Sequence, residues 1–594
     1  MKRLNSIITG IFLTAGSCQL YSQSCIRINQ CGYQPQESKV AIAFSKQEIT
    51  GDFMIMDAHT GKQVFSGAIV PAKGQGWGTF PFYYRLDFTG LQQEGSYRIY
   101  LPSTGDSSVL LSIHTDVYRD DPDIMLVFMR QQRCGDNPFL DIRCHQKDGR
   151  TMYGPMPDST LIDVRGGWHD AGDQLKYLIT SSNATARMLM AWEAAPGVFA
   201  DSMDASGRLG SNGVPDVLDE AKWGLEWIHR MHPAPGLLFH QVADDRDHIG
   251  WKRPDRDDSD YGWGKNDARV VYFATGKPQG LKMYQSLATG IANLAGRSAA
   301  VMANAYRIWD KDLGDKDYAN RCLEAAIDLY RMGKEKEGYQ QGNSYGEPYR
   351  YCEDTWADDM EWGAVELFKA TGDQKFLEEA VHYAGMAAET SWMEHDTAEH
   401  YRFYPFVNVA HARLYEYADP EMKQKLAGYY RHNIDNILRR ASTNPYMLGV
   451  PFLWCSDNLV TAFITQVLLY EQMCGDMRYH ELMVAHLDWL FGRNPWGTSM
   501  FTGIPPGGEY PQDVHTSVWR VTRREAAGGL VDGPVSATIF KKLRGLQLTE
   551  PDEFASFNNG LAVYHDDIGD YSTNEPTMDG TADAIYMMSL YLSK

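Results

Sequence analysis

The chain has 594 residues, which is too long for one ordinary hydrophobic core, so we expect a small domain beside a large one. Hydrophobic residues make up 43% and charged residues 22%, a composition typical of globular proteins that excludes a disordered chain. The net charge is -21 and no basic run occurs, so nucleic acid is not an expected partner. Aromatic residues reach 12%, and such side chains form platforms for sugar rings as well as cores.

Residues 1–23 have the pattern of a secretory signal peptide. Lys2 and Arg3 precede an apolar stretch from Ile7 to Ala15 that is too short to span a membrane as a mature helix. The residues before Cys18 resemble a weak lipidation site. We therefore expect a protein that is secreted, periplasmic or lipid-anchored at the cell surface.

Residues 24–117 predict a small β-domain. Short segments rich in β-forming residues alternate with turn sequences, a spacing that favours a β-sandwich of immunoglobulin type. It lacks the Cys–Trp–Cys pattern of antibody domains. The expected strands are 39–44, 53–57, 82–87, 96–100 and 109–113.

From residue 122 to residue 594 the hydrophobic periodicity becomes helical. In Asp216–Met231 apolar residues recur at spacings of three and four, with Pro215 ahead and Asp216 as the expected cap. Gly372 should end one helix and Asp373 should cap the next. A helical domain of this size without a short repeat is either a bundle or a closed toroid of helix pairs. The other expected helices are 286–309, 318–332, 358–370, 374–389, 421–440, 459–473, 479–491 and 581–592.

Two loop sequences carry carboxylates in a setting that favours chemistry. Gly166 to Asp173 holds Asp170 and Asp173 among three glycines, and glycine lets a backbone turn tightly and approach other groups closely. Alone, such a run is most often a surface turn. A third carboxylate, Glu575, lies near the end of the chain among an aromatic residue, an amide and loop-forming residues, with Pro576 after it.

Six motifs that occur in one order resemble glycoside hydrolase family 9 with an N-terminal immunoglobulin-like domain. The resemblance covers nearly all of the mature chain, and it is specific because six motifs share one order. It implies an all-α (α/α)6 toroid as the catalytic domain and inverting hydrolysis of β-1,4-glucosidic bonds. The substrate would be a β-glucan such as cellulose, mixed-linkage glucan or xyloglucan. The motifs are 29–33, 132–135, 166–173, 212–220, 492–495 and 574–575.

The resemblance also implies roles for the three carboxylates. Asp173 maps to the base that activates water, Asp170 would help to hold that water, and Glu575 maps to the acid that protonates the leaving oxygen. Inverting glycosidases need such an acid and base on opposite faces of the sugar. The acid must stay protonated, so its surroundings should raise its pKa. Pro576 restricts Glu575 to an extended backbone.

One motif departs from the family. A His-x-Arg commonly follows the Asn-Pro motif, and here His515 matches while Ser517 replaces the arginine. His515 is either a sugar contact or a histidine bonded within its own loop. Nearby arginines that offer a substitute are Arg520, Arg523 and Arg524. The expected substrate contacts are His515, Trp519, Arg520 and Tyr571.

Two metal sites are expected, and no organic cofactor. Two thiolates and two imidazoles make a closed tetrahedral zinc set, and some relatives carry a structural zinc in this arrangement. The alternative for the two cysteines is a disulfide. The zinc set is Cys134, Cys144, His145 and His169, and the acids near which relatives hold a calcium are Asp358 and Asp359. The alternative for these acids is a helix start that favours negative charge.

Three other functions remain open from sequence. A non-catalytic glycan-binding protein would keep the fold, but all three carboxylates are present. An exo-acting β-glycosidase on oligosaccharides would use the same residues. A polysaccharide lyase would need basic residues for an acidic polymer, and the net charge of -21 argues against it. We expect a monomer.

Overall fold

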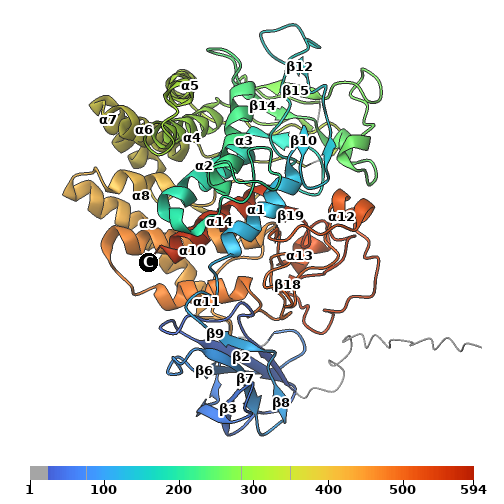
Figure 1. The fold of residues 1–594 in the computed structure, drawn as a ribbon, viewed down its shortest axis with the longest axis vertical. Helices are drawn as coiled ribbons and strands as arrows, with labels where there is room; N and C mark the ends of the chain where they lie inside the picture. Colours follow the sequence, from blue (N-terminus) through green and yellow to red (C-terminus); the bar gives the residue numbers. More distant parts are fainter. Residues whose placement is uncertain (1–23, 75–76, 282–283, 348, 594) are drawn as a thin grey trace, which may run out of the picture.

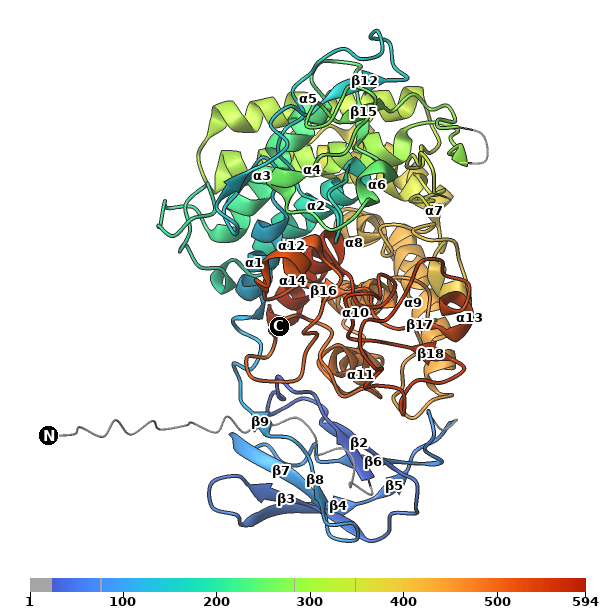
Figure 2. The same ribbon diagram turned by 90° about the vertical axis from the view of Figure 1, so that its right-hand side faces the viewer.

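The computed structural model describes residues 24–74, 77–281, 284–347 and 349–593, and the predicted signal peptide lies outside them. A β-sandwich lies at one end of the molecule and a helical domain forms the rest, with helix α11 (His480–Leu490) next to the sandwich in both views (Figures 1 and 2). The predicted order of a β-domain followed by a helical domain is confirmed. Within the described residues, no helix has the length and apolar character needed to cross a membrane.

The sandwich consists of two antiparallel sheets. In β3 the side chains of Phe53 and Ile55 alternate inward, as expected for a sheet with one buried face. Ile99 of β7 lies in the same core. One sheet has the order β1 (Ser24–Arg27), β2 (Val40–Ser45), β6 (Phe82–Asp87), β5 (Val70–Pro71). The other has the order β4 (Gln63–Ala68), β3 (Asp52–Asp57), β7 (Gly95–Leu101), β8 (Asp106–Ser107), with β9 (Leu111–Ile113) paired to β7.

The helical domain is a toroid of helix pairs. Among the described residues the inner helices α2, α4, α6, α8, α10 and α14 each contact the next, and α14 returns to α2 to close the ring. Outer helices pack on them: α1 on α14, α3 on α2, α5 on α4, α7 on α6, α9 and α11 on α10. Figure 1 shows α1 and α14, from opposite ends of the domain, side by side at its centre. The predicted (α/α)6 toroid is confirmed.

The helix bounds are as follows. The inner helices are α2 (Leu178–Ala194), α4 (Ala292–Lys311), α6 (Ala357–Thr371), α8 (Val409–Tyr415), α10 (Ser456–Cys474) and α14 (Met578–Leu592). The outer helices are α1 (Asp121–Gln132), α3 (Asp216–Met231), α5 (Lys316–Glu335), α7 (Gln374–Ala387), α9 (Pro420–Ala441) and α11. Two short helices, α12 (Ser517–Thr522) and α13 (Ala537–Phe540), lie in the long loops at one end.

Most outer helices follow the sequence prediction, whereas α1 and some inner helices do not. Helix α3 spans Asp216–Met231 as predicted, whereas α2 was missed because every residue from Leu178 to Ala191 is buried and no polar face sets a period. The predicted cap Asp216 is wrong: Pro215 is the N-cap residue, and the Asp216 carboxylate accepts from the backbone of Ser202 instead.

The junction between α6 and α7 agrees with the sequence. Gly372 has a φ of 72° at the end of α6, and the Asp373 carboxylate accepts from the Lys375 N–H at the start of α7. The helix predicted from residue 286 begins at Ala292, and α1 and α8 were not predicted.

Trp77 anchors the sandwich to the helical domain. It is 2% exposed, and its ring makes edge contacts with Tyr446 at 5.9 Å, Trp489 at 6.1 Å and Trp496 at 6.0 Å between centroids. Its Nε1 donates to the carbonyl of Phe557 at 3.0 Å. A buried aromatic cluster of this kind holds the two domains as one unit.

Candidate active site

The turn Gly166 to Asp173 is pinned to the segment that follows α1. The N–H of Cys134 donates to the carbonyl of Gly167 at 2.8 Å, and the N–H of His169 donates to that of Gln132 at 2.7 Å. The Asp170 carbonyl accepts from the N–H of Met578, at the start of α14, at 2.9 Å. The loops thus bring together positions from both ends of the helical domain.

Asp170 is an anchor of this turn. It is 1% exposed, and the hydroxyls of Thr180 and Tyr351 donate to its two carboxylate oxygens. Burial raises the pKa of Asp170 well above its usual value, with Asp579 and Asp173 adding to the rise. Water binding at Asp170, as predicted from the resemblance, would have to use the remaining lone pairs of a carboxyl that is almost closed off from solvent.

Asp173 is the open carboxylate of the pair. Its side chain is 24% exposed, its Oδ1 accepts from the N–H of Leu175 at 2.8 Å, and its Oδ2 lies 3.5 Å from Nε2 of His248. One oxygen is therefore held by the backbone while the other faces His248, and the side chain is partly open to solvent, as a base that must reach a water molecule requires.

Glu575 meets this turn directly. The Gly172 N–H donates to its Oε1 at 2.8 Å. A Cβ on Gly172 would lie 2.2 Å from the carbonyl oxygen of His515 and 2.6 Å from that Oε1, so only glycine lets the segments approach this closely. Burial, then the nearby Asp532 and Asp173, raise the pKa of Glu575 well above its usual value.

His248 is a site residue that the sequence analysis missed. Its Nε2 faces Asp173, and its Nδ1 lies 3.2 Å from Oε2 of Glu347. Burial by itself would lower the pKa of His248, but the hydrogen bonds to Asp173 and Glu347 raise that pKa to about 12. It stands 75 residues beyond Asp173, at the end of a short 3-10 helix (Asp245–His248) that no sequence pattern predicted.

The predicted sugar contacts fall into two groups. Nδ1 of His515 donates to the carbonyl of Ile568 at 2.6 Å, and burial lowers the pKa of His515. The Tyr571 ring lies 6.0 Å from that of His515. Trp519 is occupied elsewhere, because Nε1 donates to Asp513 at 2.6 Å and Arg523 covers its ring at 5.3 Å.

The arginines after His515 do not join it. Arg520 is exposed on α12, Arg523 bonds Asp513, and Arg524 stacks on Phe139 at 4.6 Å. The backbone of Ser517 contributes instead, since its N–H donates to the carbonyl of Gly172 at 3.1 Å.

A row of aromatic rings runs beside the carboxylates. Trp251, which is 39% exposed, contacts His515 at 4.7 Å, and Tyr571 contacts the half-buried Trp454 at 5.7 Å between centroids. Tyr349 continues the row at 5.8 Å from Trp454. Such rings suit the apolar faces of sugars.

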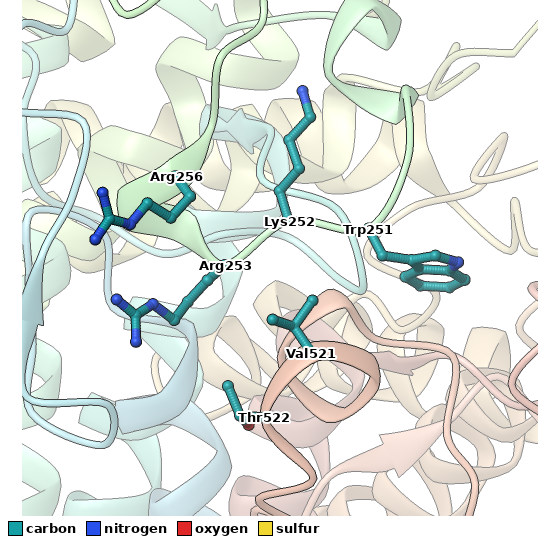
Figure 3. Close-up of a pocket in the computed structure, with 6 residues that line it drawn as sticks. All are labelled: Trp251, Lys252, Arg253, Arg256, Val521 and Thr522. Atoms are coloured by element: carbon teal, nitrogen blue, oxygen red, sulfur yellow. The ribbon is translucent and has the colours of Figure 1, made fainter.

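A pocket of about 570 Å³ lies between the loop after His248 and helix α12 (Figure 3). In that view the Trp251 ring points to one side, while the Arg253 and Arg256 guanidinium groups point to the other. Arg253 is paired with Asp255 at 2.5 Å and Lys252 with Asp258 at 3.0 Å, so their charges are largely compensated. The pocket extends the aromatic row on the Trp251 side.

The four predicted zinc ligands come together. One ligand atom from each of Cys134, Cys144, His145 and His169 lies within 4.8 Å of the others, and both cysteines carry free thiols rather than a disulfide. His145 Nε2 lies 3.3 Å from Asp257, a carboxylate partner of the kind that orients metal-bound imidazoles. The donor set fits a structural metal ion, and His169 precedes Asp170 in the chain.

Asp358 and Asp359 do not gather further oxygen ligands. Both oxygens of Asp359 accept from the guanidinium of Arg297, at 2.9 and 3.0 Å, and the same arginine binds Glu353. Neither aspartate belongs to a metal-ligand cluster of the described residues. Because a guanidinium already neutralises Asp359, the geometry offers no support for calcium there, and that site stays a prediction.

A closed toroid of helix pairs whose loops gather two aspartates and a glutamate defines the class of this protein as a glycoside hydrolase. Residues 118–588 match the family described as glycosyl hydrolase family 9, and residues 21–106 match the cellulase N-terminal ig-like domain. The chain belongs to glycosyl hydrolase family 9.

Relatives agree with this assignment. The chain is 25% identical to Endoglucanase D of Acetivibrio thermocellus over 533 residues, which covers 85% of this chain and 76% of that protein. It is 23% identical to a xyloglucan-specific endo-β-1,4-glucanase of Bacteroides ovatus, with 86% of each chain covered. The crystal structure of a metagenome-derived family 9 endoglucanase superposes with a TM-score of 0.75 at 26% identity, covering 96% of this chain and 99% of that one.

Proposed function

We propose that this protein is an inverting endo-β-1,4-glucanase in which Asp173 is the base and Glu575 the acid. The observation that carries the proposal is the hydrogen bond from Gly172 to Glu575, which sets the acid one residue from Asp173. Two carboxyls in one loop cluster, one partly exposed beside a cation and one with a raised pKa, match the two roles that inversion requires.

In the proposed reaction Asp173 accepts a proton from a water molecule as that water attacks the anomeric carbon. The bond from that carbon to the glycosidic oxygen breaks, and the carboxylic proton of Glu575 passes to the departing oxygen. Asp173 ends protonated and Glu575 ionised, and proton exchange with solvent restores both. Asp170 holds the turn that carries Asp173, bonded to Thr180 and Tyr351.

The surrounding residues orient water and sugar in this proposal. His248, held between Asp173 and Glu347, fixes the exposed carboxylate oxygen of the base. The rings of Trp251, His515 and Tyr571 would contact sugar faces along the row.

The role that we propose for the metal ion is structural. Zinc held by Cys134, Cys144, His145 and His169 would tie the segment after α1 to the turn before Asp170. Its chemistry when bound would be that of a closed four-ligand site without a water position. No catalytic step passes through it.

The substrate is a neutral β-1,4-glucan in this proposal, degraded outside the cytoplasm by a monomer. One relative is named as specific for xyloglucan, and others are named endoglucanases. The candidate substrates are therefore plain, mixed-linkage and xylosylated glucans.

Product analysis tests the proposal. Purified protein is incubated with cellulose, mixed-linkage glucan and xyloglucan, and products are separated by chromatography while proton NMR follows the anomers. Oligosaccharides of several lengths with the α-anomer first support inverting internal cleavage. A single short product from chain ends would favour the exo-acting alternative. Binding to glucan without any product would favour a glycan-binding protein, and a first-formed β-anomer would overturn inversion.

A further inference from the structure

Asp532 stands directly across a strand pair from Glu575. Strands β16 (Leu530–Val531) and β19 (Pro576–Thr577) are antiparallel, with Leu530 opposite Thr577 and Val531 opposite Pro576. The next position in this register sets Asp532 opposite Glu575, and the Asp532 N–H donates to the Glu575 carbonyl at 2.9 Å. Residues directly opposite in such a pair have side chains on the same face, with Cβ atoms roughly 4.5–5.5 Å apart.

The two carboxyls differ in how they are held. Asp532 is 1% exposed, and its oxygens accept from Nε1 of Trp454 at 2.9 Å and from Sγ of Cys455 at 3.1 Å. Two side-chain donors favour its ionised form, whereas Glu575 accepts from Gly172. The negative charge of the pair is therefore better stabilised on Asp532 than on Glu575.

We propose that Asp532 is a positioning residue that keeps Glu575 protonated, because its carboxylate lies beside the acid on the same face of the strand pair and is held there by Trp454 and Cys455. The inference rests on the proposed role of Glu575 as the acid. Two neighbouring carboxyls cannot both ionise readily, so a charge on Asp532 makes proton loss by Glu575 less favourable.

Other charged groups face this pair. Burial raises the pKa of Asp532 to about 8. The hydrogen bonds from Cys455 and Trp454 act against this rise, and Asp579 and Asp570 add to it. Asp173 and His248 act on Glu575 in opposite directions. The titratable groups that face the pair from the packed elements are Asp173, His248, Tyr349, Cys455, Asp457, Asp570, Tyr571 and Asp579.

The test is the pH profile of kcat/KM for Asp532→Asn on cellohexaose, whose leaving group needs a proton. Asparagine keeps the shape and an acceptor for Trp454, but it carries no charge. We expect near-normal activity at acidic pH, and we expect kcat/KM to fall on the alkaline side at a pH at least one unit lower than in the wild type. An unchanged limb, or an equal loss of activity at every pH, would overturn the proposal. Cys455→Ala, which removes one donor to Asp532, should move the limb less and keeps the test interpretable if Asp532→Asn does not fold.

A second substrate isolates the acid. Dinitrophenyl β-cellobioside has a leaving group that departs without protonation, so wild type and Asp532→Asn should share one profile on it. A displaced limb on this substrate would mean that Asp532 acts on the base, which contradicts the proposal. Glu575→Gln distinguishes failure of this inference from failure of the proposed function. If Glu575→Gln keeps the wild-type alkaline limb on cellohexaose, Glu575 is not the acid, and the proposed function is wrong.

Discussion

The backbone N–H of Gly172 donates to Oε1 of Glu575 across 2.8 Å, and the two residues are 403 positions apart in the chain. This contact joins the turn that precedes α2 to the residue that precedes β19 and α14, and helices α2 and α14 pack against each other. Closing the toroid is therefore the event that assembles the active site.

Replacing either proposed catalytic carboxyl should abolish hydrolysis without unfolding the protein. For Glu575→Gln and Asp173→Asn we expect a fall in kcat of roughly 10²–10⁴-fold or more, because a proton-transfer group is lost. Reducing-sugar assays measure the rate, and circular dichroism checks the fold. As a control, Asp317→Asn, at an exposed position of a helix, should keep full activity. Near-normal turnover by either site variant would end the role assignment.

Gly172→Ala should disrupt the meeting of the two loops. A Cβ there would lie 2.6 Å from Oε1 of Glu575, so one segment must move, and a shift of about an ångström costs on the order of 10²-fold in rate. The matched control is Gly428→Ala, in helix α9 with nothing within 4 Å of the new Cβ, which should be fully active and slightly more stable. Equal activity of the two variants would contradict the proposed geometry.

Trp77→Ala should detach the sandwich. Losing a buried tryptophan typically costs about 3–5 kcal/mol, so the urea midpoint of unfolding should fall. Val64→Ala, at an exposed site on β4, should behave as wild type. We regard the sandwich as a structural support, and tight binding of glucan by the isolated sandwich in an affinity gel would refute that view.

Removing a zinc ligand should remove both metal and stability. Elemental analysis of the purified protein should find close to one zinc per chain, and Cys144→Ser should lose the metal and melt at lower temperature, because structural zinc contributes directly to folding. Cys474→Ser, exposed at the end of α10, serves as the control. Mass mapping that finds Cys134 joined to Cys144 would rule out the zinc site and leave the hydrolase assignment intact.

The free energy of unfolding should decrease as the pH rises above the unfolded pKa of an aspartate, about 3.9. Burial, and then Asp532, raise the pKa of Asp457 well above its unfolded value, so its contribution is complete below that value and is lost as the pH passes the folded pKa. One such group changes stability by up to about 1.4 kcal/mol per pH unit in that window. Urea unfolding from pH 5 to 9 should show a shallower fall for Asp457→Asn. A slope equal to wild type would contradict the assignment.

The sequence by itself determined the domain order and most of the amphipathic outer helices, and it indicated three candidate carboxylates. Helix α3 has one polar and one apolar face, so its period is visible in Asp216–Met231. Strand β3 of the sandwich alternates buried and more exposed residues for the corresponding reason. Six short motifs in one order were enough to indicate the family because order along a chain is a property of sequence alone.

Only the tertiary structure decided what surrounds those carboxylates. Helix α2 is buried on every side within the ring, so its sequence carries no helical period and its Thr180 gave no sign of bonding Asp170. His248 and Asp532 reach Asp173 and Glu575 from loops and strands distant in sequence. Their pKa values and their hydrogen bonds depend on burial and on neighbours that exist only once the toroid has closed, and no local pattern encodes either.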